Sequence, residues 1–135
     1  MVSILLIEDD LNCARLVQKV LAPHDHKVLH AANGLTGLRA ARELSSALVL
    51  VDMDLPDLNG RAVVVQLRSI LREVNVPIVA FTAESGTRAQ RIALAVGCDD
   101  FISKPIDTRE FPARIHAILE RVGIKDQTIA ARVSR

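Results

Sequence analysis

The chain has 135 residues, with 17 lysines and arginines against 16 aspartates and glutamates, which leaves a formal net charge of +1. This length corresponds to one domain that can bury a full core, while the near-neutral charge and the absence of Trp and Tyr argue against a surface for nucleic acid or anionic membranes. No apolar run could span a membrane and no secretory leader is recognisable, so we expect a cytoplasmic protein.

Short apolar runs alternate with longer amphipathic stretches, five times each, along most of the chain. In chain order, this pattern predicts a strand at 2–7, a helix at 11–21, a strand at 27–31, a helix at 34–44, a strand at 47–51, a helix at 61–72, a strand at 77–81, a helix at 87–96, a strand at 101–103 and a helix at 107–122. We expect Gly97 to end the fourth helix, and Asp107 with Glu110 to begin the fifth as a capping box. Because Pro112 lacks an N–H group, the last helix should start later or kink there.

Strands that are apolar throughout predict a parallel sheet covered by helices on both faces, which is an α/β, doubly wound fold. Right-handed crossovers and five strands favour the flavodoxin-like strand order 2-1-3-4-5. In this order the first and third strands are neighbours, and ligands bind just beyond their carboxyl ends. We expect one domain at residues 1–123, followed by a short tail at 124–135 and no effector domain.

Carboxylates follow the two strands that should meet at this crevice. Glu8 and Asp9 come directly after the first strand, and Asp52 and Asp54 come at the end of the third. At an effective dielectric constant near 20, two carboxylates about 4 Å apart repel by about 4 kcal/mol, so a positive partner is required. A hard divalent cation such as Mg²⁺, or Mn²⁺, takes oxygen ligands and suits a half-open acidic pocket.

Two further side chains should reach the same edge of the sheet. Thr82 follows the fourth strand and Lys104 follows the fifth. Phosphoryl transfer to a carboxylate needs one Asp as nucleophile, a metal and a Lys to neutralise the phosphoryl oxygens, and a hydroxyl to donate a hydrogen bond. The residues at this edge therefore predict phosphoryl transfer.

Four motifs, in this order, resemble those of response-regulator receiver domains of two-component signalling: 6–10 (LIEDD), 49–60 (VLVDMDLPDLNG), 81–83 (FTA) and 101–105 (FISKP). The resemblance covers about residues 2–122 and is specific because all four motifs occur at the family's spacing. It implies that Asp52 is the phosphoacceptor. It further implies that Asp9 and Asp52 bind Mg²⁺ directly, that Glu8 binds it through water, and that the main-chain carbonyl of Met53 or, preferably, Asp54 is a further ligand. Thr82 and Lys104 would bind the phosphoryl group. Phe101 would be the aromatic side chain that changes rotamer with Thr82 on activation.

As a function, the resemblance implies a regulatory phosphoacceptor rather than an enzyme. A histidine kinase or a histidine phosphotransfer protein would supply the phosphoryl group. Phosphorylation would alter the surface formed by the fourth helix, the fifth strand and the fifth helix, and so control a protein partner or pass the phosphate on. We expect a stand-alone receiver that is a monomer or a phosphorylation-dependent dimer.

Two alternatives were weighed against this interpretation. Asp52 and Asp54 also resemble the DxD motif of haloacid-dehalogenase-type phosphatases, but in that family the motif closes the first strand, Pro56 is unexpected there, and the chain leaves no room for a cap domain. A constitutive scaffold is disfavoured because the acceptor residues are all present.

Several other features carry smaller expectations. Asp54 and Glu84, each two residues beyond an expected site residue, should flank the hydrolytic water and tune the phosphoryl lifetime. The family resemblance, and the need to aim Lys104 at the acids, predict a cis Lys104–Pro105 bond. The remaining polar and thiol groups are expected to be structural or solvated: Cys13, Cys98, His24, His26, Arg61 and Arg68.

Overall fold

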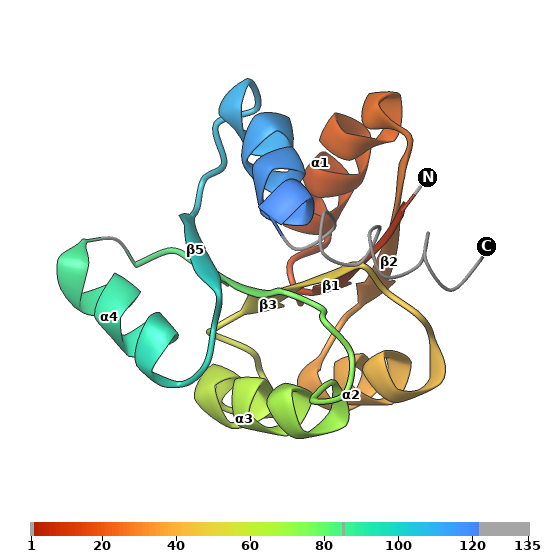
Figure 1. Cartoon of the computed structure of the whole chain (residues 1–135). Helices are drawn as coiled ribbons and strands as arrows, with labels where there is room; N and C mark the ends of the chain where they lie inside the picture. The colour runs from red at the N-terminus through yellow and green to blue at the C-terminus, as the bar shows by residue number, and fades with distance from the viewer. Residues whose placement is uncertain (1, 85, 122–135) are drawn as a thin grey trace.

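The computed structural model describes residues 2–84 and 86–121. Its five strands form one parallel sheet with the order β2-β1-β3-β4-β5, as predicted (Figure 1). The strands are β1 (Val2–Ile7), β2 (His26–Ala31), β3 (Leu48–Asp52), β4 (Ile78–Thr82) and β5 (Asp100–Ser103). The α-helices between them are α1 (Leu11–Leu21), α2 (Gly34–Glu43), α3 (Gly60–Ile70) and α4 (Thr87–Ala95), and a C-terminal helix covers residues 110–121.

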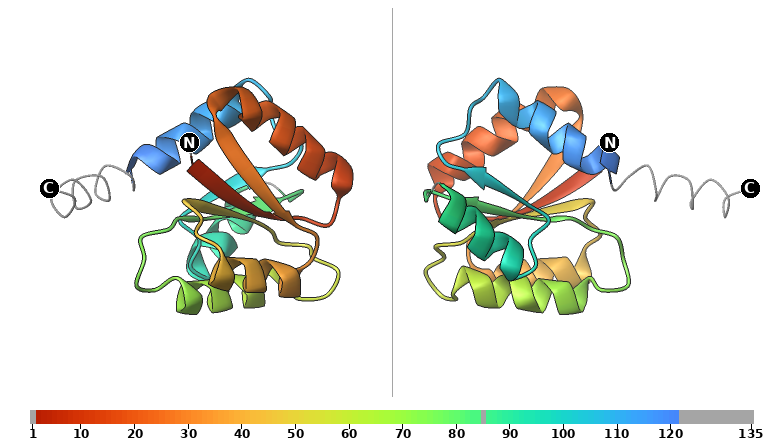
Figure 2. Two further views of the ribbon diagram at one scale, coloured as in Figure 1. Left: turned by 90° about the vertical axis from the view of Figure 1, so that its right-hand side faces the viewer. Right: turned by 60° about the vertical axis from the view of Figure 1, so that its left-hand side comes forward.

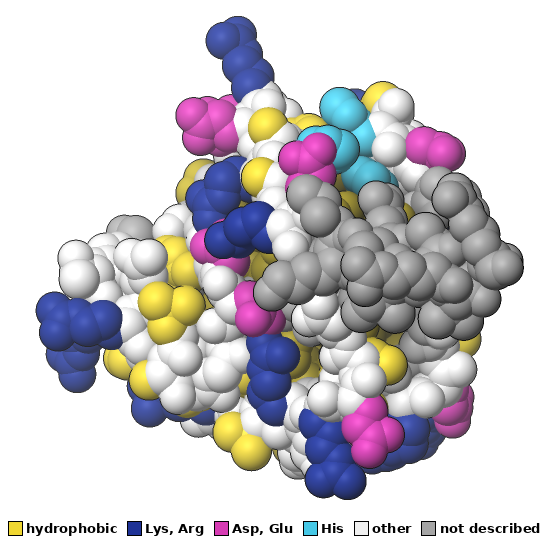
Figure 3. All heavy atoms as spheres, viewed as in Figure 1, with side chains coloured by type: hydrophobic (Ala, Val, Ile, Leu, Met, Phe, Trp, Pro, Cys, Tyr) yellow, Lys and Arg dark blue, Asp and Glu magenta, His cyan; other side chains and the backbone are white. Residues whose placement is uncertain are grey.

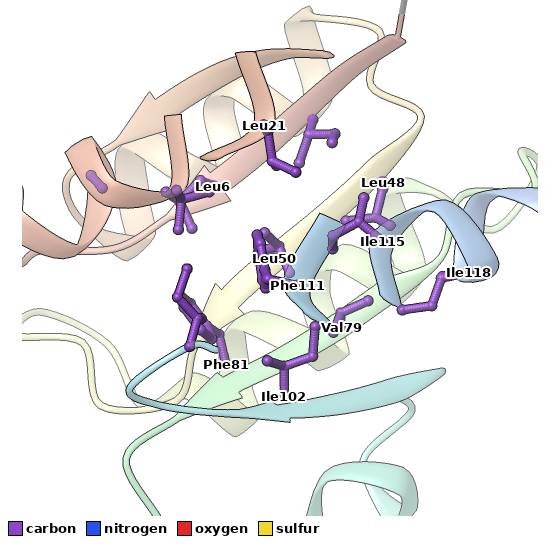
Figure 4. Packing of buried hydrophobic residues seen from close by; sticks show 14 residues of the cluster. Leu6, Leu21, Leu48, Leu50, Val79, Phe81, Ile102, Phe111, Ile115 and Ile118 are labelled. Atoms are coloured by element: carbon purple, nitrogen blue, oxygen red, sulfur yellow. The ribbon is translucent and has the colours of Figure 1, made fainter. Parts of the chain in front are cut away.

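Helices cover both faces of the sheet. Figure 1 shows α1 and the C-terminal helix on one face and α2 and α3 on the other, with α4 beside β5, and the turned views of Figure 2 agree. β3 and β4 are buried along their whole length. Their side chains point alternately to the two faces of the sheet and pack into two separate apolar cores. Figure 4 shows the first core, in which Phe111 and Ile115 of the C-terminal helix pack against Leu50 and Phe81 of the sheet.

The predicted ends of the strands and of the first four helices agree with the observed ones or differ from them by one or two residues. The start of the last helix differs by more. Residues 108–109 form a turn, and the regular helix begins at residue 110. The Asp107 side chain caps this start, accepting hydrogen bonds from the N–H groups of Arg109 (2.9 Å) and Glu110 (3.3 Å). Pro112 cannot donate to the carbonyl four residues earlier, so the helical ladder is interrupted in the first turn. The expectation of a later start is confirmed.

Two further backbone predictions are confirmed. Gly97 follows α4 with φ +113°, a left-handed conformation that glycine adopts without strain. The Lys104–Pro105 peptide bond is cis. A short 3₁₀ helix at Ala22–His24, between the predicted helix and strand, precedes β2. The expected domain boundary after residue 123 and the tail at 124–135 lie outside the described residues.

The surface carries no strong charge asymmetry on the face seen in Figure 3, where basic and acidic side chains are interspersed. Within the described residues, no helix combines the length and the apolar character needed to cross a membrane.

Histidine side chains gather beside the C-terminal helix (Figure 3). The burial of His26 predicts that the stability of the fold depends on pH. His26 is half-buried, and its Nδ1 atom is buried without a hydrogen-bond partner among the described residues. Burial first, and then the neighbouring His24 and His116, lower the pKa of His26, while Asp25 opposes this. The folded state therefore disfavours the imidazolium form.

Because the unfolded chain then binds the proton more readily, the free energy of unfolding should fall as the pH drops below about 6.5. We expect His26→Gln to lose less stability than the unchanged protein between pH 7 and 5, measured by urea denaturation. The exposed His24 supplies the control: because burial contributes more than His24 to the lowered pKa of His26, His24→Gln should keep most of the loss. An unchanged pH profile in His26→Gln would contradict the prediction.

Candidate functional site

The candidate site is held in place by hydrogen bonds that extend the strand ladder past the strand ends. The N–H of Glu8 donates to Ala31 O (2.9 Å). The N–H of Lys104 donates to Thr82 O (2.7 Å). The residues that follow neighbouring strands are therefore fixed side by side at the carboxyl edge of the sheet.

The predicted acid cluster is present. Ligand oxygens of Glu8, Asp9 and Asp52 all lie within 4.8 Å of one another. Glu8 is 0% exposed and Asp52 is 2% exposed, whereas Asp9 is exposed. This donor set, which contains only oxygen and is open to solvent on one side, fits a hard divalent cation that keeps part of its water shell.

Lys104 lies against the two buried carboxylates, as predicted. Its Nζ is 2.8 Å from Glu8 Oε1 and 3.4 Å from Asp52 Oδ2, and it lies 5.2 Å from the ring centroid of Phe81. One ammonium against three carboxylates leaves two formal negative charges at the site. That remainder matches the charge of a divalent cation.

The buried carboxylates perturb one another. Burial raises the pKa of Asp52, and the neighbouring Glu8 raises it further, while the N–H of Asp54 and the Lys104 ammonium oppose the shift. Burial also acts to raise the pKa of Glu8. Hydrogen bonds with Asp52 and Lys104 outweigh this effect, so the pKa of Glu8 is lowered overall. Burial acts to lower the pKa of Lys104, but the two carboxylates raise it overall. Without a metal, the two buried carboxyls therefore shift in opposite directions, with the pKa of Asp52 raised and that of Glu8 lowered.

This repulsion predicts that Asp52→Asn stabilises the metal-free fold. A raised carboxyl pKa means that the folded state resists ionisation of Asp52, and this costs stability at every pH above the ordinary pKa of an Asp. We expect the free energy of unfolding to rise by about 1–2 kcal/mol in EDTA at neutral pH, because the amide removes one like charge and can donate to Glu8. Urea denaturation measures this gain. The exposed Asp9 provides the control: Asp9→Asn should give a smaller gain, and equal stability of Asp52→Asn and the unchanged protein would contradict the argument.

The loop after Asp52 is packed closely against the start of α3. The N–H of Asp54 donates to Asp52 Oδ1 (2.9 Å). A Cβ on Gly60 would lie 2.5 Å from Met53 Cα and 2.6 Å from Met53 O, so only glycine allows this approach. The Met53 carbonyl therefore faces α3. This favours Asp54 over Met53 as the source of a carbonyl ligand.

A pocket of about 320 Å³ opens beside these residues and brings several of the predicted ones together. Thr82, Asp54 and Glu84 line its polar part, and Phe101 lines its apolar part. The Thr82 hydroxyl oxygen accepts a hydrogen bond from the N–H of Glu84 (3.1 Å), and Thr82 is 4% exposed. Phe101 is half-buried and packs against the second core.

Some contacts at the site are not evident from the sequence. His30 Nε2 lies 2.6 Å from Glu8 O and, since a carbonyl only accepts, the ring N–H donates to it. The Asp57 carboxylate accepts hydrogen bonds from the N–H groups of Gly34 (2.8 Å) and Leu35 (3.0 Å) and so ties the loop after β3 to the start of α2. Each pair is separated by more than twenty residues, so no local pattern indicates it.

Three residues expected to be structural or solvated have more specific positions. The Cys13 thiol lies beside Glu8, and burial together with this carboxylate raises the pKa of Cys13 to about 12. Arg68 donates to Gly97 O (2.6 Å) and pairs with Asp99, so it joins α3 to the segment between α4 and β5. Arg61 lines the pocket. Arg61 is exposed on α3, as expected, whereas the contacts of Arg68 go beyond the expected solvated helix face.

Comparison with known proteins agrees with this geometry. The model of the response regulator receiver domain family matches residues 4–116. Response regulator ArlR of Staphylococcus aureus is 36% identical over 126 residues, which cover 93% of this chain and 56% of ArlR. The chain therefore spans about half the length of this curated relative.

Solved structures show the same architecture. A CheY-like response regulator receiver domain protein from Methanospirillum hungatei has a TM-score of 0.83 at 23% identity, covering 93% of this chain and 98% of that one. The receiver domain of the sensor histidine kinase PA1611 from Pseudomonas aeruginosa has a TM-score of 0.75 at 27% identity, covering 90% of this chain and 96% of that one, and holds a magnesium ion in its active site cleft. The phosphatase alternative gains no support from the matching family model. From the sheet order, the acid cluster and the family match together, the chain belongs to the response regulator receiver domain family of two-component signalling.

Proposed function

We propose that Asp52 is the phosphoacceptor of this receiver domain and that Glu8, Asp9, Asp52 and the Asp54 carbonyl hold the Mg²⁺ ion on which acceptance depends. The observation that carries the proposal is the position of Asp52. It is 2% exposed at the carboxyl end of β3, within 4.8 Å of the other acids, and in contact with Lys104.

In this proposal, an Asp52 carboxylate oxygen attacks the phosphorus of a donor, and the bond from phosphorus to the nitrogen or oxygen of the donor breaks. Lys104 places its positive charge beside the transferred group, and the Thr82 hydroxyl donates to one of its oxygens. The bound Mg²⁺ supplies the positive charge that Lys104 alone does not. The donor would be the phosphohistidine of a kinase or of a phosphotransfer protein.

The signal would leave through α4, β5 and the C-terminal helix. The pocket between Thr82 and α4 is lined by Ala89, Ile92 and Ala93 together with Phe101, and its volume of about 320 Å³ could admit an aromatic ring. If Thr82 moves toward a phosphoryl group, the half-buried Phe101 ring gains space to turn inward. The output would be a changed surface recognised by a protein partner. The stand-alone organisation, the oligomeric state and the cytoplasmic location stay predictions.

Hydrogen exchange tests the switch. Beryllofluoride with Mg²⁺ mimics the phosphoryl group. Its addition should change the amide exchange rates of α4, β5 and the C-terminal helix. Asp52→Asn is the control and should show no such change. Exchange differences confined to α1 and α2 would contradict the proposed output surface.

A further inference from the structure

Charged side chains from three segments line the pocket that opens next to the loop after Asp52. Asp54 comes from the loop after β3, Glu84 from the segment after β4, and Arg61 from the first turn of α3. All three are exposed, and the pocket that they line extends to the buried Thr82. Among the described residues that line the pocket, Arg61 is the one basic residue.

The backbone of Arg61 is fixed at the mouth of this pocket. Its N–H donates to the Asn59 side chain (2.8 Å), which caps α3. The preceding Gly60 packs against the backbone of Met53 so closely that a Cβ there would lie 2.5 Å from Met53 Cα. Arg61 therefore cannot leave the loop that follows Asp52 unless the start of α3 moves with it.

Helix electrostatics does not account for an arginine at this position. The N-terminus of a helix carries partial positive charge, which favours acidic side chains and disfavours cations. The first turn of α3 contains no acidic residue. The charges that can compensate Arg61 are instead the carboxylates of Asp54 and Glu84 across the pocket, and a guanidinium can donate to both at once.

We propose that Arg61 is a positioning residue for phosphoryl transfer, which balances Asp54 and Glu84 at the mouth of the pocket and so admits an anionic phosphoryl donor to Asp52. The proposal rests on Asp52 being the phosphoacceptor. Two uncompensated carboxylates at the entrance would repel a phosphorylated donor, and the repulsion would grow with the negative charge of the donor. Arg61 acts through the electrostatic field at the pocket rather than by contact with the reacting atoms.

The test compares two small donors of different charge. Acetyl phosphate is a dianion at neutral pH, and phosphoramidate carries less negative charge. In Arg61→Gln, the second-order rate constant for phosphorylation by acetyl phosphate should fall about 3–10-fold at low salt, while that for phosphoramidate falls less, and the acetyl phosphate deficit should shrink at high salt. Adding Glu84→Gln to Arg61→Gln should restore much of the acetyl phosphate rate.

Arg72→Gln is the matched control. It removes the same charge from an exposed position just beyond the opposite end of α3, and it should leave both rates within about 2-fold. Urea denaturation should show that Arg61→Gln and Arg72→Gln are equally stable.

The outcomes separate this inference from the function on which it rests. If the unchanged protein does not accept phosphate on Asp52, the proposed function is wrong. If the unchanged protein is labelled and Arg61→Gln behaves like Arg72→Gln with both donors, the role of Arg61 is wrong. An equal loss of phosphorylation rate with both donors, unaffected by salt and by Glu84→Gln, would indicate a structural effect. This result would also overturn the proposed role of Arg61.

Discussion

Asp52→Asn is expected to abolish phosphorylation by acetyl phosphate, and EDTA is expected to abolish it in the unchanged protein. The acid cluster gives the reason for both results. Asp52 lies at the end of β3 with Lys104 3.4 Å away, whereas the Glu8 carboxylate is held by Lys104 at 2.8 Å and Asp9 is exposed beyond the end of the neighbouring strand. With two formal negative charges left over in the cluster, an incoming phosphoryl group is strongly repelled until a divalent cation is bound.

Intact mass spectrometry after incubation with acetyl phosphate and Mg²⁺ measures the result. The unchanged protein should gain one phosphoryl group. Asp9→Asn should be labelled more slowly and need more Mg²⁺, because it loses a ligand but keeps the acceptor. Asp57→Asn is the matched control for the site of labelling, since Asp57 lies in the same loop but caps α2, and the variant should still gain one phosphoryl group. Labelling of Asp52→Asn at another residue, or equal labelling in EDTA, would overturn the assignment.

Lys104→Met is expected to have the largest effect on stability. Removal of the ammonium leaves Glu8 and Asp52 buried without a compensating charge, and breaking a buried ion pair typically costs 3–5 kcal/mol. Because the Lys104 side chain is 19% exposed, we expect a somewhat smaller loss of about 2–4 kcal/mol in the free energy of unfolding in EDTA at neutral pH. Urea denaturation measures it.

A double-mutant cycle identifies the cause. Asp52→Asn in the Lys104→Met background should recover a large part of the loss, because one of the two unpaired carboxylates is then neutral. Lys27 on β2 is exposed and supplies the matched control: Lys27→Met should change stability by no more than about 0.5 kcal/mol. A Lys104→Met loss no larger than this, or no coupling to Asp52→Asn, would show that the ion pair does not compensate the acids.

The sequence predicted the central strands β1, β3 and β4 well because they are nearly continuous apolar runs, and a parallel sheet buried on both faces selects for such runs. The ends were less accurate because hydrogen bonding, not hydropathy, decides where an element stops. The end of β3 illustrates this: the apolar pattern stops at residue 51, whereas the strand continues through Asp52. Pro112 was informative for the opposite reason, since a missing N–H group has a local effect that needs no tertiary contact.

The acidic half of the site could be predicted because strand order alone brings Glu8, Asp9 and Asp52 to one edge. The contacts that hold it in place could not. Those of His30 with Glu8 and Asp57 with α2 depend on side chains that meet only after the sheet has formed. Arg61 is exposed as expected, but its place at the pocket could not be predicted, because it depends on the packing of Gly60 on Met53.

The Asp57 contact has a further consequence for the loop at residues 53–59. One part of this loop is tied to α2 by the Asp57 carboxylate, and its end is tied to α3 by the Asn59 cap and the adjoining Gly60. A segment anchored to two helices loses its conformational entropy when the protein folds and not when a donor arrives, so little ordering is left for the encounter itself. Asp57→Ala would loosen this loop, so that the entropy loss would occur in the transfer step instead. The reaction would then slow through a more negative activation entropy, although no group that touches phosphate has changed.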